Sequence, residues 1–405
     1  MSDAWSYVPL ADVAHINMGQ SPPSITVNED GSGVPFLQGN AEFGSRHPAP
    51  TKFCTKPQKQ ARSGDILLSV RAPVGAVNLA DKPVCIGRGL SAITATGVDP
   101  GFLWHVVRKQ AAGLVRVAQG STFAAVNRAD LCALSIPLPT RPEQRKIAAI
   151  LASVDEAIEK TQAVMDQVQV VKRGLMQELF TRGLPGRHAQ FVETEIGEIP
   201  REWRIRRLRD AGSWLSGGTP SRQNIKYWNG SIPWISGKDM KRTRLHDAVE
   251  HVSEASVGNG TRIAGKGAIL MVVRGMILAH TFPVALTLTD VTFNQDLKAL
   301  IANDSYEPEF LLYWLEHRDW RILSLVDTAS HGTKRLSSQR LFAELIPCPE
   351  REEQERIAQI LRQCDSYTDT TSTKLQGLTA VKSALMSVLL TGELRVTPDP
   401  DPEPE

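Results

Sequence analysis

The sequence is poor in cysteine and in aromatic residues, and it contains no long apolar run. Its five cysteines among 405 residues lie far apart and form no C-x-x-C pair, which excludes a disulfide framework and a thiolate zinc site. No apolar stretch reaches the ~18 residues that a membrane-spanning helix needs, and the first residues lack the basic and apolar regions of a secretion signal. With 41% hydrophobic and 22% charged residues, the composition is typical of a globular protein, for which we expect a cytoplasmic location and no contact with a membrane.

The sequence also lacks a complete motif for catalysis or for a cofactor. The segment GTRIAGKG at residues 260–267 is close to a phosphate-binding loop, but Gly267 stands where a serine or threonine must reach Mg²⁺. The segment QSPPS at residues 20–24 lacks the acidic or amide residue and the aromatic residue of the N-P-P-Y loop of amino-methyltransferases. The nine histidines show no spacing typical of metal ligands. We therefore predict a chain with no catalytic residues, no bound metal and no cofactor of its own.

What the sequence does contain is an internal repeat. Residues 136–184 align without a gap on residues 346–394, and 19 of the 49 positions are identical, far more than chance would give. The preceding blocks repeat more faintly, for example where GVPFLQG at residues 33–39 matches SIPWISG at residues 231–237. The chain is thus one unit written twice. Each unit begins with a block of short strands and a few helices and ends in one long helix.

Each long helix carries a heptad seam and not only an amphipathic face. From the first isoleucine of each copy, seam positions recur at alternating spacings of four and three residues, as in a coiled coil. The predicted apolar seam consists of Ile147, Leu151, Val154, Ile158, Met165, Val168, Leu175, Leu179, Ile357, Leu361, Leu375, Leu378, Leu385 and Leu389. Polar residues occupy the same seam positions in both copies, at Thr161 and Thr371 and at Lys172 and Lys382. Such residues can fix the register of the helix pair, and for the lysines exposure at a frayed helix end is an equal alternative.

The two long helices are predicted to pack antiparallel. The residues from 147 to 179 span roughly 50 Å at ~1.5 Å per residue, and a block with a radius of gyration of only ~15 Å cannot easily return the chain over that distance. The sequence therefore predicts an α+β protein in which two mixed blocks are joined by two long antiparallel coiled-coil helices with a pseudo-two-fold axis. The predicted boundaries are 1–140 for the first block, 141–184 for the central helix, 185–202 for a linker, 203–349 for the second block, 350–394 for the distal helix and 395–405 for a disordered acidic tail.

The helices have kept their likeness while the blocks have diverged. Two similar frames that hold different surfaces at a fixed separation suit the recognition of two different half-sites on one linear ligand. Double-stranded DNA is the most natural such ligand, because half-sites on one face of the duplex recur about every 34 to 36 Å. A symmetric scaffold with two peptide-binding blocks is the alternative that the repeat alone leaves open.

Several short motifs occur in both copies or open the second one. They are R-x-E-Q-x-x-I-A-x-I-L at residues 141–151 and 351–361, K-x-x-L-M at 172–176 and 382–386, GEIPREW at 197–203 and GGTPS at 217–221. In this combination, which extends over nearly the whole chain, the sequence resembles the specificity subunits of Type I restriction-modification enzymes. The resemblance implies that each block is a target recognition domain that reads one half of a bipartite, asymmetric DNA site.

The resemblance also implies partners and cofactors. The helices would hold two methylation subunits, which are expected to use S-adenosylmethionine, and restriction or translocase subunits that use ATP and Mg²⁺ can join the complex. Among the positions beside the seam, we expect Glu143 and Arg145 to face the methylation subunits. The alternative is a stand-alone two-headed DNA-binding protein or a coiled-coil scaffold.

Candidate base-reading residues follow from the correspondence between the copies. Arginine and lysine recognise guanine and phosphate, and asparagine and glutamine recognise adenine. In the first block the candidates are Gln38, Asn40, Arg46, Arg71, Arg88, Thr122 and Asn127. In the second block they are Ser236, Lys238, Asp239, Arg274, Gln295, Lys334 and Arg335. Arg71 and Arg274 are the best matched of these, because each follows an apolar strand at the same place in its copy.

Overall fold

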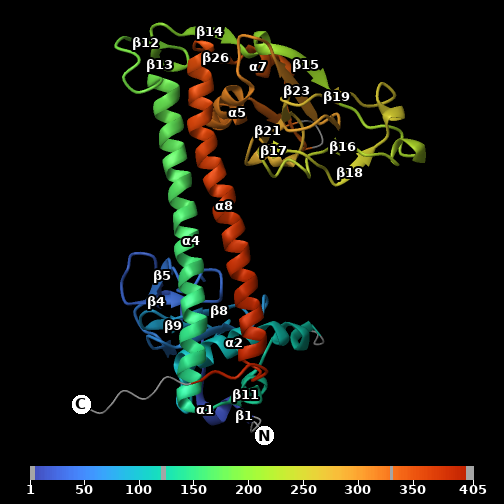
Figure 1. Ribbon diagram of the computed structural model, residues 1–405. Coiled ribbons are helices and arrows are strands. Elements are labelled where there is room, and N and C mark those ends of the chain that lie inside the picture. The colour runs from blue at the N-terminus through green and yellow to red at the C-terminus, as the bar shows by residue number, and fades with distance from the viewer. Residues whose placement is uncertain (1–4, 120–124, 329–331, 398–405) are drawn as a thin grey trace. The chain divides into compact units, whose positions relative to one another are not determined.

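The computed structural model describes residues 5–119, 125–328 and 332–397. The chain divides into two compact units (Figure 1). The first unit comprises residues 1–162 and 373–405, and the second comprises residues 163–372. Each unit therefore contains one block of the repeat together with parts of both long helices, α4 (Arg141–Arg182) and α8 (Arg351–Leu389).

The block of the first unit contains two sheets. The four-stranded sheet has the order β2 (Ala14–Met18), β10 (Leu90–Ala95), β7 (Ile66–Ser69) and β8 (Val77–Leu79). The five-stranded sheet has the order β3 (Val27–Asn28), β5 (Lys52–Cys54), β4 (Val34–Leu37), β9 (Val84–Ile86) and β6 (Gln60–Ala61). A separate pair joins β1 (Ser6–Pro9) to β11 (Ser135–Leu138). The helices are α1 (Leu10–Val13), α2 (Pro100–Gln119), α3 (Arg128–Cys132) and the 3-10 turn η1 (Ser24–Thr26).

The block of the second unit is built in the same way. One sheet has the order β15 (Gly212–Ser216), β23 (Leu297–Ala302), β20 (Ile269–Val272), β21 (Val284–Thr287) and β17 (Arg244–Leu245), and the other has the order β18 (Glu250–Val252), β16 (Ile232–Ile235), β22 (Val291–Phe293) and β19 (Ile263–Ala264). Three pairs stand apart, namely β12 (Phe191–Thr194) with β13 (Gly197–Pro200), β14 (Arg204–Arg207) with β26 (Leu345–Cys348), and β24 (Val326–Thr328) with β25 (Lys334–Leu336). The helices are α5 (Pro308–His317), α6 (Asp319–Leu323), α7 (Ser338–Ala343) and the 3-10 turns η2 (Leu208–Ala211), η3 (Ile225–Tyr227), η4 (Glu254–Ser256) and η5 (Met276–Ala279).

The strand orders of the two blocks match. The series β2-β10-β7-β8 corresponds to β15-β23-β20-β21, and β5-β4-β9-β6 corresponds to β18-β16-β22-β19. Both blocks contain one parallel pair in the second sheet, β4 with β9 and β16 with β22, among antiparallel neighbours. The repeat that the sequence shows faintly in the blocks is thus a repeat of topology.

Strand β7 is apolar at successive positions because both of its faces are covered. Ile66 and Leu68 pack into one hydrophobic cluster with helix α2, whereas Leu67 packs into another cluster with residues of β9. Successive side chains of a strand point to opposite faces, so a strand that is covered on both faces needs apolar residues at every position. The same holds for β20 (Ile269–Val272), all of whose side chains are buried.

Helices α4 and α8 pack antiparallel in each unit, as predicted. In the first unit, Lys382 near the end of α8 bonds Asp155 near the start of α4. In the second unit, Lys172 near the end of α4 bonds Asp365 near the start of α8, at 2.6 Å. The predicted α+β class with two blocks and two long antiparallel helices is confirmed.

The predicted seam residues all lie on the covered side of their helices. Those near the helix ends are fully buried where the blocks cover them, namely Ile147, Leu151, Leu179, Ile357, Leu361 and Leu389. The remaining ones are half-buried, namely Val154, Ile158, Met165, Val168, Leu175, Leu378, Leu375 and Leu385. Two helices alone cannot enclose their seam completely, so the half-buried class is expected away from the blocks.

The polar seam residues are buried, and the lysines do not lie at frayed ends. Thr161, Thr371, Lys172 and Lys382 are each less than a tenth exposed. Both lysines bond an aspartate of the opposite helix, and these aspartates also occupy equivalent positions of the repeat. Of the two explanations that the sequence left open for the lysines, the structure excludes the frayed end.

The E-Q pair of the repeated motif is structural, and the expectation that Glu143 faces a partner is wrong. Glu143 is 3% exposed, and both of its carboxylate oxygens accept hydrogen bonds from Arg395, at 2.5 and 3.1 Å. Gln144 is buried too, and its side-chain oxygen accepts the backbone N–H of Asp99 at 2.7 Å. Arg145 is exposed. The equivalent Gln354 accepts the backbone N–H of Glu307 at 2.9 Å, so the glutamine of each motif attaches its helix to its block.

Several predicted boundaries differ from the structure. Helix α8 ends at Leu389 and not at residue 394, because Gly392 adopts a positive φ that terminates the helix, as Gly183 does after α4. The predicted linker 185–202 contains the hairpin β12–β13. Arg395 belongs to the first unit through its bonds to Glu143, so the predicted tail begins later than residue 395.

Candidate nucleic-acid interface

The parallel strand pair of each block brings candidate residues together. In the first block β4 and β9 pair with Leu37 opposite Ile86, so the chain leaves both strands at the same edge. Gln38 follows the first of these strands and Arg88 the second. In the second block β16 and β22 pair with Ile235 opposite Phe293, and Ser236 and Gln295 follow in the same way. In each block, two residues that lie 50 or 59 positions apart in the sequence are therefore brought to one edge.

A serine that the sequence analysis did not single out joins the first of these groups. Ser21 Oγ hydrogen-bonds the side chain of Gln38, accepting from Nε2 at 2.9 Å and donating to Oε1 at 3.1 Å. It also accepts the backbone N–H of Arg88 at 3.4 Å. The side chains of Gln38 and Arg88 are exposed. We call Ser21, Gln38 and Arg88 the first reading cluster.

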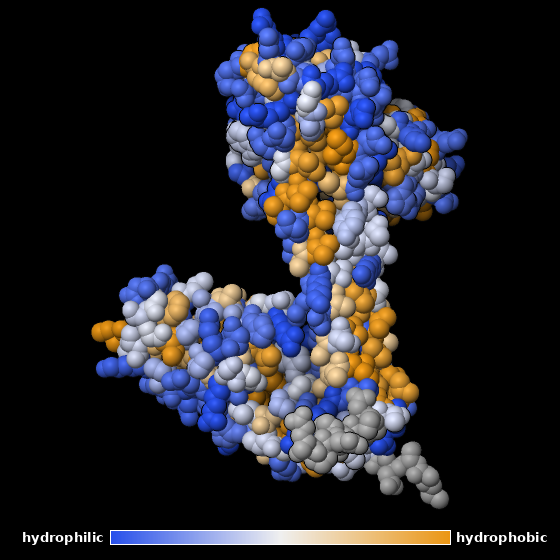
Figure 2. All heavy atoms as spheres, turned by 60° about the vertical axis from the view of Figure 1, so that its left-hand side comes forward, coloured by the Kyte–Doolittle hydropathy of each residue, from blue (hydrophilic) through white to orange (hydrophobic). Residues whose placement is uncertain are grey.

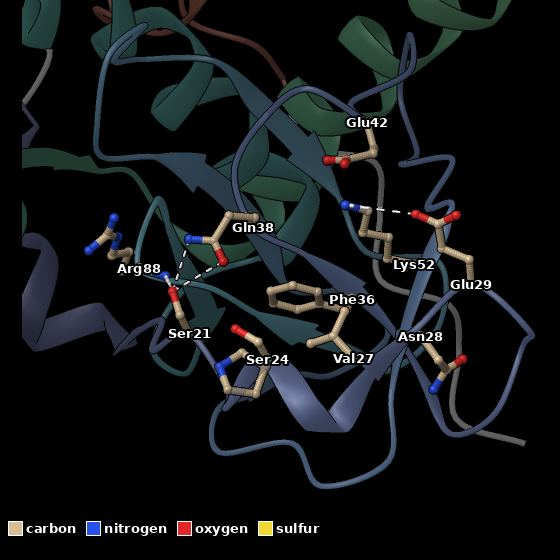
Figure 3. Close-up of a pocket in the computed structure, with 11 residues that line it drawn as sticks. Ser21, Ser24, Val27, Asn28, Glu29, Phe36, Gln38, Glu42, Lys52 and Arg88 are labelled. Atoms are coloured by element: carbon tan, nitrogen blue, oxygen red, sulfur yellow. Dashed lines mark hydrogen bonds and ion pairs between the residues drawn. The ribbon is translucent and has the colours of Figure 1, made fainter.

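The first reading cluster lies at one end of a surface pocket (Figure 3). The pocket has a volume of about 630 Å³, and its lining includes Phe36, Glu42 and Lys52. The lining thus combines polar and charged side chains with one aromatic ring. Such a lining offers both donors and acceptors to a base edge.

The equivalent group in the second block is built from Thr219, Ser236 and Gln295, which we call the second reading cluster. Thr219 Oγ1 donates to Gln295 Oε1 at 2.6 Å, as a hydroxyl does to Gln38 in the first block. Ser236 donates its Oγ–H and its N–H to Asp239 Oδ2, at 2.8 and 2.9 Å. Asp239 also accepts the N–H of Val249, so its carboxylate holds the loop together and is not presented to a ligand.

Two glycines at equivalent positions allow the hydroxyl loops to reach these edges. A Cβ at Gly19 would lie 2.2 Å from the carbonyl oxygen of Gly87, and one at Gly217 would lie 2.2 Å from that of Asn294. No side chain fits at such distances. Glycine at both positions lets the loops carrying Ser21 and Thr219 lie against the turns that carry the candidate residues.

Arg71 and Arg274 lie at equivalent places, as the sequence predicted. Each follows the second inner strand of its sheet, and each forms an isolated backbone bridge, Arg71 with Ala125 and Arg274 with Arg335. Both arginine side chains are exposed. Lys334 lies beside Arg335 in β25 and donates to Thr328 Oγ1 at 2.8 Å. The second block therefore gathers three basic side chains at this place.

The remaining candidates are dispersed. Arg46 faces α4, where its guanidinium lies 3.7 Å from Glu159, and Asn127 caps helix α3 with its side-chain oxygen. Asn40 and Lys238 lie in the loops that follow β4 and β16. Thr122 lies outside the described residues.

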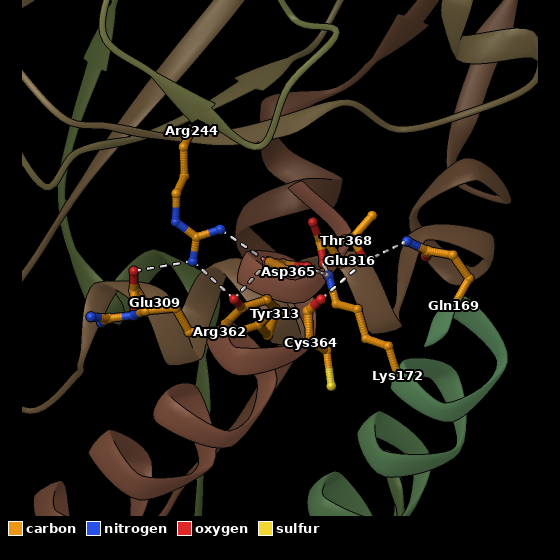
Figure 4. A network of polar contacts seen from close by, with 10 residues as sticks. All are labelled: Gln169, Lys172, Arg244, Glu309, Tyr313, Glu316, Arg362, Cys364, Asp365 and Thr368. Atoms are coloured by element: carbon orange, nitrogen blue, oxygen red, sulfur yellow. Dashed lines mark hydrogen bonds and ion pairs between the residues drawn. The ribbon is translucent and has the colours of Figure 1, made fainter. Parts of the chain in front are cut away.

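The blocks are fixed to the helices by buried charges (Figure 4). In the second unit, the carboxylate of Asp365 accepts hydrogen bonds from Lys172 at 2.6 Å, Arg244 at 2.9 Å and Tyr313 at 2.7 Å. Lys172 also bonds Glu316 at 2.9 Å. Burial raises the pKa of Asp365, but Lys172 and the other donors lower it more, so this pKa lies below its usual value.

The first unit has a counterpart around Asp155. Its carboxylate bonds Lys382 and, at 3.2 Å, Arg108, and His105 Nδ1 lies 4.0 Å away. His105 takes the place that Tyr313 has in the second unit. Because burial disfavours its charged form, the pKa of His105 is lowered to about 4.

Within the described ranges, no group of three or more histidine, cysteine, aspartate or glutamate residues could hold a metal ion. In the same part of the chain, no helix is both long and apolar enough to cross a membrane.

Comparisons with known proteins agree with this architecture. The family model of the Type I restriction modification DNA specificity domain matches residues 2–169 and 200–380. The chain is 41% identical over 181 residues to the type I restriction enzyme MjaX specificity subunit of Methanocaldococcus jannaschii, covering 44% of this chain and 43% of that protein. It is 32% identical over 241 residues to the EcoR124I/EcoR124II specificity subunit of Escherichia coli, covering 58% of this chain and 56% of that protein. The matches thus span about half the length of these curated relatives.

Two solved structures share the fold. The S subunit of a Type I restriction-modification system from M. genitalium superposes with a TM-score of 0.63 at 16% identity, covering 96% of this chain and 97% of that chain. A chain of a type I R-M system solved in a study of complex assembly and conformational transition superposes with a TM-score of 0.57 at 20% identity, covering 97% and 99%. At these identities the likeness establishes the fold.

Proposed function

The chain belongs to the family of Type I restriction-modification DNA specificity proteins, and from this we propose that it is the DNA sequence-specificity subunit of such a system. It reads a bipartite, asymmetric site on double-stranded DNA, one half with each block. The observation that carries the proposal is the pair of reading clusters, which lie at equivalent places of two equivalent blocks but present different side chains.

The chemistry of the two clusters suits two different half-sites. The first presents an amide and a guanidinium, Gln38 and Arg88, which match adenine and guanine in the major groove. The second presents a hydroxyl and an amide, Ser236 and Gln295, and no arginine at the place of Arg88. Two blocks of the same topology whose strand edges carry different side chains favour an asymmetric target.

The long helices offer matched surfaces for two copies of one partner. Val171 of α4 and Val381 of α8 occupy equivalent positions of the repeat, and their side chains are 46% and 50% exposed. Figure 2 shows apolar residues gathered on the surface of the long helices. We assign these surfaces to two methylation subunits, which supply S-adenosylmethionine and the methyl-transfer chemistry. Restriction subunits that use ATP and Mg²⁺ join the same complex.

The partner assignment is tested by Val171→Glu and Val381→Glu. Each change is expected to remove one methylation subunit and the double change both, without altering the unfolding midpoint, because the valines are half exposed. Ala152→Glu, on an exposed position of α4, is the matched control. Two bound subunits in the double variant, measured by native mass spectrometry, would contradict the assignment.

The reading function is tested by exchanging residues 1–135 for the same block of a relative. Mapping of methylated adenines across the genome of cells that carry the exchange is expected to show one half of the site changed and the other intact. A site changed in both halves would contradict two independent readers. Specific methylation by this chain without a methylation subunit would contradict its role as a recognition subunit.

A further inference from the structure

Two isoleucines project from the blocks with almost no cover. Ile25 of η1 is 95% exposed and Ile225 of η3 is 80% exposed. Among the large apolar side chains of the described residues, only Val249, at 79%, is exposed to a similar degree. Burying an isoleucine side chain stabilises a fold by about 1.5 to 3 kcal/mol. Each block therefore lacks this contribution to its stability at the same kind of turn.

The two turns are held at equivalent places by equivalent bonds. Thr55, directly after β5, donates its N–H and its hydroxyl to the carbonyl of Thr26, at 3.0 and 3.3 Å. Ser253, directly after the equivalent strand β18, donates its N–H to Tyr227 at 2.9 Å and its hydroxyl to Lys226 at 2.7 Å. The sequences of the turns differ, but the exposed isoleucine and its support recur.

Contacts within each loop also support the two turns. In η1, Thr26 donates its N–H and its hydroxyl to Pro23, at 2.9 and 2.7 Å. Near η3, Trp228 Nε1 donates to the carbonyl of Ser221 at 3.2 Å, and the guanidinium of Arg222 lies 3.6 Å from the centre of the Trp228 ring.

Each isoleucine also belongs to the loop that carries the hydroxyl of a reading cluster. Ile25 follows Ser21 by four residues, and its neighbour Ser24 lines the same pocket as the first reading cluster. Ile225 follows Thr219 by six residues in the corresponding loop. An apolar projection thus accompanies the polar reading groups in both blocks.

We propose that Ile25 and Ile225 are wedges that insert between neighbouring base pairs of duplex DNA, one in each half-site. The inference rests on the proposed function, because it assumes that the reading clusters contact DNA. Proteins that deform DNA commonly insert an isoleucine, leucine or methionine at a base step, and the unstacked step is more easily formed in some sequences than in others. The wedges therefore add to sequence selection at steps that the polar groups do not contact.

The test uses the complex of the full chain with its methylation subunit and a duplex that carries the site mapped in cells. 2-Aminopurine is placed at successive positions of the site, since its fluorescence rises when a base is unstacked. The variants are Ile25→Ser and Ile225→Ser, with Ile→Leu at each position as the conservative rescue. Leu288→Ser is the control, because Leu288 is 41% exposed in the turn that precedes β22, whereas Gln295 follows that strand.

With the wild-type complex, we expect one position in each half-site to brighten. Ile25→Ser should abolish the signal in one half-site only and Ile225→Ser in the other, each with a roughly ten- to one-hundred-fold loss of affinity. The leucine variants should retain both signals. The dependence of affinity on salt should stay unchanged in every variant, because no phosphate contact is lost. Thermal unfolding should also stay unchanged, since the side chains are exposed in the free protein.

Three results would overturn the wedge. The first is specific binding with unchanged affinity and unchanged fluorescence in both serine variants. The second is loss of both signals in either single variant. The third is a site at which no base is unstacked and at which replacing one thymine with uracil lowers the affinity of the wild-type complex as much as the serine variant does. That result would mean that the isoleucine contacts the methyl group of the thymine. Each of these leaves the proposed function standing, whereas a wild-type complex that prefers no site would overturn the proposed function together with the wedge.

Discussion

The buried charges that join the second block to the helices can be tested by neutralising Asp365. Asp365→Asn keeps the size of the side chain and removes its charge. The side chains of Lys172 and Asp365 are only 10% and 13% exposed, so the pair is not screened by water as a surface pair would be. Breaking a buried pair by changing one partner costs about 3 to 5 kcal/mol. Lys172 keeps Glu316 in the variant, at 2.9 Å, so we expect the low end of that range, about 3 kcal/mol.

We expect Asp365→Asn to lower the urea concentration at the midpoint of unfolding. With a slope of about 2 to 3 kcal/mol per molar urea, a loss of ~3 kcal/mol moves the midpoint of the second unit by roughly 1 M. Tryptophan fluorescence reports mainly this unit, because six of the eight tryptophans lie within residues 163–372. Glu178→Gln, whose partner Arg182 is more than half exposed on α4, is the control and should change the stability by less than about 0.5 kcal/mol.

A double change separates charge balance from simple loss of contacts. Lys172→Met alone leaves an excess carboxylate in the cluster, and Asp365→Asn alone leaves an excess cation. Together they restore neutrality, so the combined loss should be smaller than the sum of the single losses by about 1 to 3 kcal/mol. Strictly additive losses would refute the reasoning. Because the pKa of Asp365 is lowered in the fold, its contribution is present above the usual carboxyl pKa and is lost as the pH falls through the lowered value.

Three further outcomes follow from the same structure. Leu361→Lys places a charge at a fully buried seam position and should destabilise the coiled coil by about 2 to 5 kcal/mol, which urea unfolding followed by circular dichroism would detect. The pKa of His105 is lowered to about 4 in the fold, so between pH 7 and pH 5 the unfolded chain binds a proton that the folded chain does not. The free energy of unfolding of the first unit should therefore fall by roughly 2 kcal/mol over this range. His105→Tyr should remove this pH dependence, and an equal fall in the variant would contradict the assignment to His105. Deleting one heptad from α4 and the facing heptad from α8 shortens both helices by roughly 10 Å, so genome-wide methylation mapping should show a spacer shorter by about three base pairs, and an unchanged spacer would contradict the role of the helices in setting it.

Much of the architecture could be predicted because it is local or repeated. The heptad seam is visible in the sequence, since a spacing of four and three follows from the geometry of the helix itself. The doubled blocks and the antiparallel helices follow from the repeat and from simple distances. The matched places of Arg71 and Arg274 were found in the same way, because a strand and the residue after it are neighbours in sequence.

The burial of the seam lysines and of Glu143 could not be predicted from the sequence. A lysine in an apolar seam fits either burial or exposure, and only the aspartates of the opposite helix decide between them. Glu143 stands off the seam and so looked free for a partner, yet Arg395, about 250 positions away, covers it. In both cases the deciding residue is contributed by another part of the chain.

The sequence by itself determined that the chain is one unit written twice on a pair of long helices, because periodicity and self-similarity need no tertiary contacts to be seen. Only the tertiary structure decided which side chains form the reading clusters and which isoleucines stay uncovered. Ser21 meets Gln38 and Arg88 only because two parallel strands end at one edge and a glycine lets the loop approach them. Ile25 lies between Ser24 and Thr26 in a segment whose sequence is typical of a loop. The turn that carries it is held by bonds from Thr55 to the carbonyl of Thr26, and strand pairing brings Thr55 within reach. Contacts between distant segments depend on how strands pair and pack, and no local pattern encodes them.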